Sequence, residues 1–408
     1  MAESTSVYLH IPFCRHRCSY CDFNTYAGKE KVIPDYVAAL CREIQMVADA
    51  GRTVPIHTIF LGGGTPSLLS VAQLESILDT LGACFDIQAG AEITLEANPG
   101  TVSPAYLQGL RLVGVNRLSF GMQSAHPADL RLLERQHDFA EVIQAVQWAR
   151  QAGFENLSLD LIFGAPVQTL ARWQQSLELA LRLAPEHLSL YALTLEPGTR
   201  LQRWVRHGLV LSPDDDLAAE MYEWAGQRLA AAGYSQYEIS NWAKGEGERP
   251  AFACRHNLQY WHNQPYFGFG AGAHGYVQGR RTANVLGIER YIERCQAGKM
   301  RGFPTGPAAA HSIRVDRWTE MQETMMVGLR LTQEGVSRSV FYRRFGLPLL
   351  DVFGETIGRL EQAGLLEWAG TEGDILRLTR RGRLLGNQVF MHFVNEVEPA
   401  IVAKPQAQ

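Results

Sequence analysis

Three cysteines lie within eight residues near the start of the chain, at Cys14, Cys18 and Cys21. They follow a strand-like run, residues 7–13, in which Pro12 removes a backbone donor and limits further pairing. Gaps of three and two residues let the backbone curl round one small inorganic cluster and reach three of its corners. A cubane iron–sulfur cluster usually takes four thiolates, so one iron would stay open for reaction.

The cysteine motif alone leaves other sites open. A zinc knuckle or a disulfide-closed loop also suits three closely spaced cysteines. Arg15, His16 and Arg17 lie between the thiols, where positive charge favours thiolates and offsets the charge of a cluster. Taken singly, each of these residues is equally typical of ordinary loop charge.

The spacing CxxxCxxC resembles the cluster motif of the radical S-adenosylmethionine (SAM) superfamily. This resemblance implies a [4Fe-4S] cluster on Cys14, Cys18 and Cys21, with the amino and carboxyl groups of SAM on the fourth iron. It also implies that an electron from the cluster splits SAM into methionine and a 5′-deoxyadenosyl radical. An electron donor would then be needed if SAM is cleaved.

Polar and glycine residues follow the predicted strands. Gly62-Gly63-Gly64-Thr65-Pro66 comes after the second strand, where glycine lets the backbone approach a ligand and expose its amides. We expect this turn to hold the amino acid end of SAM. Glu96 ends the third strand, and a carboxylate in an apolar strand needs a partner such as a ribose hydroxyl pair. A satisfied core carboxylate is the alternative.

Three further polar residues come from the next two strands. Gln123 ends the fourth strand, Arg135 follows it, and Asp160 lies between leucines in the fifth. We expect these side chains to converge at one opening of the barrel and to contact the adenosyl group or the substrate. A structural ion pair between Arg135 and Asp160 is the alternative.

In combination, the motifs resemble the oxygen-independent coproporphyrinogen III oxidase superfamily over nearly the whole chain. The resemblance rests on the lead-in Tyr8-x-His10-x-Pro12-Phe13, the cysteines, the GGGTP turn, the Glu96 strand and the segments 121–124 and 160–164. It implies that SAM on the cluster is lined by Tyr8, Tyr20, Gly63, Gly64, Thr65 and Glu96. Gln123, Arg135 and Asp160 would make further adenosyl or substrate-side contacts.

The chain departs from the oxidase pattern at one cysteine. The oxidase carries CxxxCxxCxC, whereas the last position here is Phe23, and only thirteen residues precede Cys14. Within the superfamily the chain instead resembles the HemW group, regarded as haem-binding chaperones. The implied function is to bind the cluster, SAM and haem and to deliver haem to acceptor proteins. The alternative is the oxidase itself, which decarboxylates coproporphyrinogen III to protoporphyrinogen IX, although Phe23 argues against that activity.

A second stretch, residues 254–261, is similar to the HNxxYW motif of the haem-binding group. Imidazole is a common axial ligand of haem iron, so we predict that His256 binds haem. Tyr260 and Trp261 offer flat faces for the macrocycle. Cys254 is a second candidate ligand. The alternative is a structural role in which these residues close the open side of the barrel.

The elements that must position these residues alternate between strand and helix. Six strands are predicted at 7–13, 58–61, 92–96, 117–120, 156–163 and 187–193, with helices at 36–48, 71–81, 104–112, 139–152 and 170–183. This order predicts an α/β fold, a parallel sheet curled into a partial (β/α)6 barrel. Chemistry in such folds gathers at the carboxyl ends of the strands.

We predict four segments along the chain. Residues 1–240 form the partial barrel with the cluster and SAM. Alternating polar and apolar residues predict one more strand at 234–242, across the end of this segment. Residues 241–317 connect it, with the haem motif, to a mostly helical, winged-helix-like domain at 318–397. Residues 398–408 are expected to be a flexible tail.

Composition limits the partners. The 408 residues include 38 Lys and Arg and 42 Asp and Glu, a net charge of −4 that gives no support to a nucleic-acid partner. No apolar run is long enough to predict a stable membrane span. Seven cysteines with no secretion signal predict reduced thiols and a cytoplasmic location.

Overall fold

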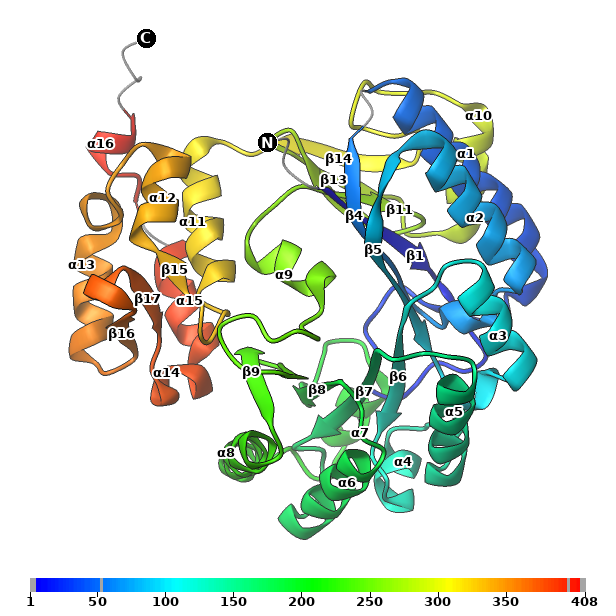
Figure 1. Ribbon diagram of the computed structural model, residues 1–408, viewed down its shortest axis with the longest axis horizontal. Helices are drawn as coiled ribbons and strands as arrows, with labels where there is room; N and C mark the ends of the chain where they lie inside the picture. Colours follow the sequence, from blue (N-terminus) through cyan, green and yellow to red (C-terminus); the bar gives the residue numbers. More distant parts are fainter. Residues whose placement is uncertain (1–4, 52–53, 395–396, 404–408) are drawn as a thin grey trace. The chain divides into compact units, whose positions relative to one another are not determined.

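The computed structural model describes residues 5–51, 54–394 and 397–403 and divides into two compact units (Figure 1). The first unit holds residues 1–228 and 265–313, and the second holds residues 229–264 and 314–408. Residues 229–264 therefore group with the C-terminal segment, whereas the stretch that follows them returns to the first unit. The functional division predicted at residues 240 and 317 stays a prediction.

Six parallel strands form the centre of the first unit. They lie side by side in chain order: β1 (Thr5–Ile11), β4 (Pro55–Gly63), β5 (Asp86–Ala97), β6 (Arg117–Gln123), β7 (Leu157–Phe163) and β8 (His187–Ala192). Leu9 pairs with Leu61 and Leu61 with Leu95, and all three side chains are fully buried. Buried leucines in register explain why these strands read as apolar runs. The α/β fold and its six parallel strands are as predicted.

Helices connect these strands and lie along one side of them (Figure 1). Ser70 with Gln73 and Asp138 with Glu141 form capping boxes that fix two of the helix starts. The long helices are α1 (Ile33–Asp49), α2 (Val71–Cys84), α3 (Pro104–Leu112), α5 (Phe139–Gln151), α6 (Leu170–Arg182) and α8 (Asp215–Ala231). Shorter elements are β2 (Phe13–Cys14), β3 (Tyr26–Ala27), α4 (Pro127–Leu132) and α7 (Arg200–Arg206), with single turns at Glu30–Val32, Pro66–Leu68 and Pro99–Thr101.

The segment 265–313 extends the same sheet beyond β1. Strand β11 (Tyr266–Phe269) pairs in parallel with β1, and β12 (His274–Val277), β13 (Arg280–Asn284) and β14 (Ala309–Arg314) continue outward, with α10 (Ile288–Ala297) between the last two. A Cβ on Gly268 would lie 1.7 Å from the His274 carbonyl oxygen, so only glycine allows β11 and β12 to approach this closely. The glycine-rich run at 268–275 therefore serves strand packing.

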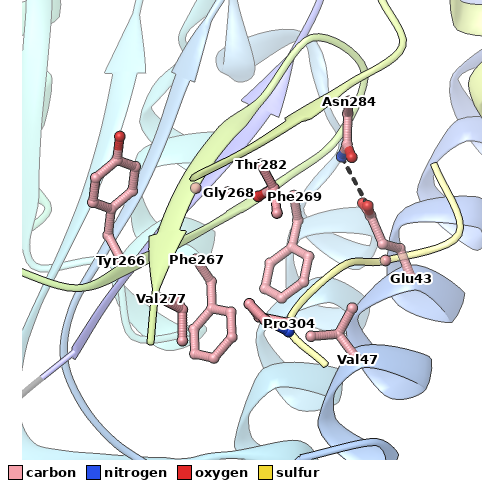
Figure 2. Close-up of a pocket in the computed structure, with 12 residues that line it drawn as sticks. Glu43, Val47, Tyr266, Phe267, Gly268, Phe269, Val277, Thr282, Asn284 and Pro304 are labelled. Atoms are coloured by element: carbon pink, nitrogen blue, oxygen red, sulfur yellow. Dashed lines mark hydrogen bonds between the residues drawn. The ribbon is translucent and has the colours of Figure 1, made fainter. Parts of the chain in front are cut away.

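A buried carboxylate joins α1 to this segment (Figure 2). Glu43 accepts hydrogen bonds from the Gly270 amide at 2.9 Å, the Asn284 side-chain amide at 2.8 Å and the Tyr291 hydroxyl at 2.6 Å. Burial raises the pKa of Glu43 to about 7, although these three donors oppose the shift. Sequence reasoning gave Glu43 no role, because its partners lie more than two hundred residues away.

The second unit begins with a hairpin, β9 (Tyr234–Glu238) and β10 (Asn241–Lys244), followed by α9 (Arg255–Trp261). The prediction of one strand across residues 234–242 is wrong. The chain turns after Glu238, whose carboxylate accepts the Ser240 amide at 2.9 Å, and this bond stabilises a reversal that periodicity does not reveal.

Helices and a small sheet complete this unit. The helices are α11 (Arg317–Gly328), α12 (Arg338–Phe345), α13 (Leu349–Gln362), α14 (Arg380–Leu384), α15 (Gly386–Val394) and α16 (Ala400–Ala403), with a single turn at Thr371–Gly373. The sheet has the order β15 (Val336–Ser337), β17 (Ile375–Leu378), β16 (Leu366–Ala369). This content agrees with the mostly helical C-terminal region predicted.

Of the predicted tail, residues 404–408 lie outside the described residues. Within the described ranges, no helix has the length and apolarity that a membrane crossing requires.

Candidate functional site

The three cysteines of the motif lie on one closed loop between β1 and α1. Cys14 is buried, Cys18 and Cys21 are half-buried, and all are free thiols. The Cys21 amide donates to the Cys18 carbonyl oxygen at 3.3 Å, which makes a tight turn between these two ligands. Pairing of β2 with β3 closes the loop behind them. The spacing read from the sequence therefore corresponds to one rigidly held unit.

Each sulfur has a hydrogen-bond partner. The Thr65 hydroxyl donates to Cys14 Sγ at 3.6 Å and Arg135 Nη1 donates to Cys18 Sγ at 3.5 Å, while the Thr25 hydroxyl lies 3.8 Å from Cys21 Sγ. Such donors favour thiolates.

Three free thiols on one loop provide the donor set that a three-cysteine iron–sulfur site needs. Burial raises the pKa of Cys14 to about 11, so cluster binding there would have to displace a proton. Among residues 5–51, 54–394 and 397–403, no three His, Cys, Asp or Glu side chains converge on a position for a single metal ion.

Ser19, at the centre of the loop, ties it to two helices. Its hydroxyl donates to the Leu132 carbonyl oxygen at 2.8 Å, and its carbonyl oxygen accepts the Leu201 amide at 2.9 Å. Arg200 binds Glu134 at 2.8 Å and also donates to the Arg17 carbonyl oxygen. Sequence reasoning missed these anchors. The only local signal was a small hydroxyl residue beside Cys18.

The glycine turn after β4 packs directly on the cysteine loop. The Gly64 amide donates to the Ile11 carbonyl oxygen at 2.9 Å and the Thr65 amide to the Phe13 carbonyl oxygen at 2.8 Å. A Cβ on Gly64 would lie 2.6 Å from that Phe13 oxygen, so close backbone approach explains the glycine. The amides predicted to face SAM have protein partners here, and contact of Gly63, Gly64 and Thr65 with SAM stays a prediction.

Two acidic residues face the same region from β5 and β7. Glu96 accepts the Gly63 amide at 3.0 Å, and burial together with the charge of Asp160 raises the pKa of Glu96 to about 7. Asp160 accepts the Ser119 hydroxyl at 3.0 Å, and burial is the main cause that raises its pKa. Arg135 does not contribute the alternative ion pair, because it binds Cys18 and the Gly121 carbonyl oxygen.

Two tyrosines and a glutamine complete the predicted set. The Tyr8 hydroxyl lies 3.0 Å from His10 Nδ1. Tyr20 is half-buried in the cysteine loop, and burial raises its pKa. Gln123 has φ 64° at the irregular end of β6, a left-handed conformation that turns the chain there.

Contacts around the cysteine loop and the ends of the strands thus involve most of the predicted residues of the first unit. Thr65 binds Cys14, Arg135 binds Cys18, and Gly63 binds Glu96, whose charge interacts with Asp160. Asp160 lies in the middle of β7, whereas the others come from the carboxyl ends of strands or from loops, where such folds carry chemistry.

The predicted haem ligand His256 lies in the second unit, on α9. It is 1% exposed, and its Nε2 lies 2.9 Å from the Tyr260 hydroxyl. The two rings meet edge to face, with centroids 5.0 Å apart. Cys254 is fully buried just before this helix. Iron ligation through Nε2 of His256 would require the Tyr260 hydroxyl to move away, and the role of His256 stays a prediction.

Comparisons with known proteins agree with these features. Residues 8–180 match the Radical SAM superfamily, and residues 315–385 match the HemN C-terminal domain. "Heme chaperone HemW" of Bacillus subtilis (strain 168) is 40% identical over 394 residues, covering 96% of this chain and 100% of the relative. The protein of the same name from Escherichia coli (strain K12) is 36% identical, covering 96% and 98%.

The fold also matches a solved structure. Coproporphyrinogen III oxidase (HemN) from Escherichia coli, a radical SAM enzyme, superposes with a TM-score of 0.81 at 23% identity, covering 97% of this chain and 91% of that one. This match establishes the shared fold. The 40% identity over 96% of this chain establishes the narrower group. The chain belongs to the HemW family of the radical SAM superfamily.

Proposed function

We propose that this protein is a haem chaperone that binds a [4Fe-4S] cluster, SAM and haem and delivers haem to acceptor haemoproteins. The observation that carries the proposal is the 40% identity to a haem chaperone over 96% of this chain. Phe23 supports the distinction from the oxidase. It occupies the position of the oxidase's fourth cysteine, and its side chain is 61% exposed.

Cys14, Cys18 and Cys21 are proposed to bind the cluster. The free thiols on one loop and the donors at their sulfurs support this assignment. SAM is proposed to lie on the open iron, against Tyr8, Tyr20, Gly63, Gly64, Thr65 and Glu96. Gln123, Arg135 and Asp160 are proposed as adenosyl or substrate-side contacts. When bound, the cluster supplies a reducing electron.

Haem is proposed to bind at α9, with His256 as the axial ligand. Tyr260 and Trp261 are half-buried on the same helix and offer aromatic faces to the macrocycle. The acceptor proteins and an electron donor for SAM cleavage belong to the same proposal. So does a cytoplasmic location, which the seven free cysteines support.

Haem titration followed by transfer tests the proposal. Cluster-loaded protein is titrated with haem and then mixed with apomyoglobin as a model acceptor, while absorption spectra follow both steps. We expect stoichiometric binding and then loss of haem to the acceptor. Protein that binds no haem, or that never releases it, would contradict the chaperone function.

An anaerobic assay with coproporphyrinogen III, SAM and a reductant separates the chaperone from the oxidase. We expect no formation of protoporphyrinogen IX. Turnover at an enzymatic rate would instead establish the oxidase activity.

A further inference from the structure

A fully buried acid in the second unit holds an arginine. The side chain of Glu238, at the end of β9, is 0% exposed, and its carboxylate accepts hydrogen bonds from the Ser240 amide and the Asn241 side-chain amide. Arg330, two residues beyond α11, places Nη2 3.7 Å from the same carboxylate. A buried carboxylate is costly without a cation, so this pairing fixes where the guanidinium lies.

The guanidinium of Arg330 lies on the haem motif. Its central carbon is 4.5 Å from the ring centroid of Trp261, the last residue of α9. The same group is 5.8 Å from the centroid of Phe390 on α15. A cation over the face of an indole is attracted by the ring quadrupole, and tryptophan is the best aromatic partner for it.

Beyond the contact with Arg330, apolar packing is the main interaction that orients the Trp261 ring. Its indole Nε1 is buried and has no hydrogen-bond partner within the part of the chain that the structure describes. The ring is partly buried and packs against a small apolar cluster formed by Tyr237, Ala243, Ala253, Leu258 and Leu331. The Arg330 contact therefore supplies the directional interaction at this ring.

The end of α9 is joined to the C-terminal helices in a similar way. Asn263 Nδ2 donates to the Thr324 hydroxyl at 3.1 Å, and Arg344 donates to the Asn263 carbonyl oxygen at 2.8 Å. Arg330 is the member of this set that touches a side chain of the HNxxYW motif itself.

We infer that Glu238 and Arg330 are positioning residues that fix the Trp261 ring, and through it α9, for haem binding. This inference rests on the proposed haem function and adds residues outside the motif to its machinery. The C-terminal domain would then contribute to haem binding, because Arg330, just after α11, and Glu238, on β9, together place the guanidinium on Trp261.

The test measures haem affinity of the full-length, cluster-loaded protein by absorption titration. Arg330→Met should weaken haem binding about 2- to 30-fold, the range that loss of a cation–π contact produces. Arg330→Lys keeps the charge and should recover part of the affinity. SAM affinity, measured by equilibrium dialysis, should stay unchanged in both variants.

The chain offers a matched control. Arg338 lies 3.6 Å from the ring centroid of Trp368 on β16, so Arg338→Met removes the same kind of contact away from α9. It should leave haem affinity unchanged. In a Trp261→Leu background, Arg330→Met should cause no further loss, because a residue that acts through Trp261 has nothing left to orient.

Several outcomes would overturn the inference. They are wild-type affinity in Arg330→Met, an equal loss in Arg338→Met, or additive losses in the Trp261→Leu background. If Arg330→Met fails to fold, Glu238→Gln and Arg330→Lys carry the test with the same expected direction. Wild-type protein that binds no haem would overturn the proposed function as well, whereas normal wild-type binding with an unaffected Arg330→Met overturns this inference alone.

Discussion

Arg135 donates a hydrogen bond from Nη1 to the sulfur of Cys18 at 3.5 Å, although 117 residues separate them in the chain. Its other terminal nitrogen is held by the Gly121 carbonyl oxygen at 2.9 Å. Through its Gly121 carbonyl, strand β6 thus holds the permanent positive charge of Arg135 against one proposed cluster ligand. Charge and hydrogen bonds at the sulfurs are two of the means by which a protein tunes a cluster's reduction potential.

Replacing Arg135 by Met should make the cluster harder to reduce. Loss of a hydrogen bond from a charged donor costs about 1.5–3 kcal/mol. Only the part of this energy that differs between the oxidised and the reduced cluster changes the potential. For one electron, about 1.4 kcal/mol corresponds to about 60 mV, so the potential should fall by up to roughly 60–130 mV. A redox titration followed by electron paramagnetic resonance measures the shift. Arg135→Lys is the control, and its cluster potential should lie between those of the wild type and Arg135→Met. An unchanged potential in Arg135→Met would show that Arg135 does not tune the cluster.

Cys18→Ser should abolish cluster assembly while leaving the chain folded, because two thiolates remain of the three proposed. Iron and sulfide analysis after anaerobic reconstitution measures the loss, and circular dichroism checks the fold. Cys84→Ser, at the end of α2, is the matched control and should load fully. Full iron content in Cys18→Ser would show that the cluster binds elsewhere.

Glu96→Gln should weaken SAM binding. The carboxylate already holds the Gly63 amide, and a carboxylate accepts from a ribose hydroxyl pair in a way that an amide nitrogen cannot. The expected loss is about 10-fold, the effect of losing roughly one charge-assisted hydrogen bond. Equilibrium dialysis with SAM measures it. Glu92→Gln, four residues earlier in β5, should bind normally, and equal losses in both variants would point to general damage to the strand.

His256→Ala should weaken haem binding or shift the haem absorption bands, because the proposed axial imidazole is gone. His262→Ala is the matched control: His262 follows α9 directly and its ring binds Glu334 at 3.0 Å. That variant should keep the wild-type spectrum. Wild-type affinity and bands in His256→Ala would return His256 to a structural role beside Tyr260.

The stability of the first unit should fall as pH rises, and Glu43 should account for part of the fall. Its pKa rises from 4.5 to about 7 on folding, so between these values the folded chain keeps a proton that the unfolded chain has released. The resulting stabilisation is complete below pH 4.5 and is lost as pH rises through 7. This one group contributes a slope of up to about 1.4 kcal/mol per pH unit.

Denaturant unfolding between pH 4 and 8 checks this expectation on variants that differ in one carboxylate. Glu43→Gln cannot titrate, so its free energy of unfolding should depend less on pH than that of the wild type, although the variant is less stable overall. Glu293→Gln, an exposed carboxylate on α10, should keep the wild-type slope. Parallel curves for Glu43→Gln and wild type would assign the pH dependence to other groups.

Local patterns determined much of this protein. The period of apolar residues placed the six parallel strands and the helices between them to within a few residues at most ends. The spacing of Cys14, Cys18 and Cys21 indicated one ligand loop, because side chains only three or four residues apart in the chain can bind the same small cluster. The family motifs placed the proposed SAM and haem residues on these elements.

Tertiary structure alone decided the long-range partners. Periodicity cannot show that β11 returns to pair with β1, that Glu43 meets Asn284 across 241 residues, or that Arg330 lies on Trp261. It also missed the hairpin reversal after Glu238. These contacts form because segments far apart in the chain bury apolar surface against each other, and because the charges buried in that way then need partners. Both conditions arise only in the packed chain.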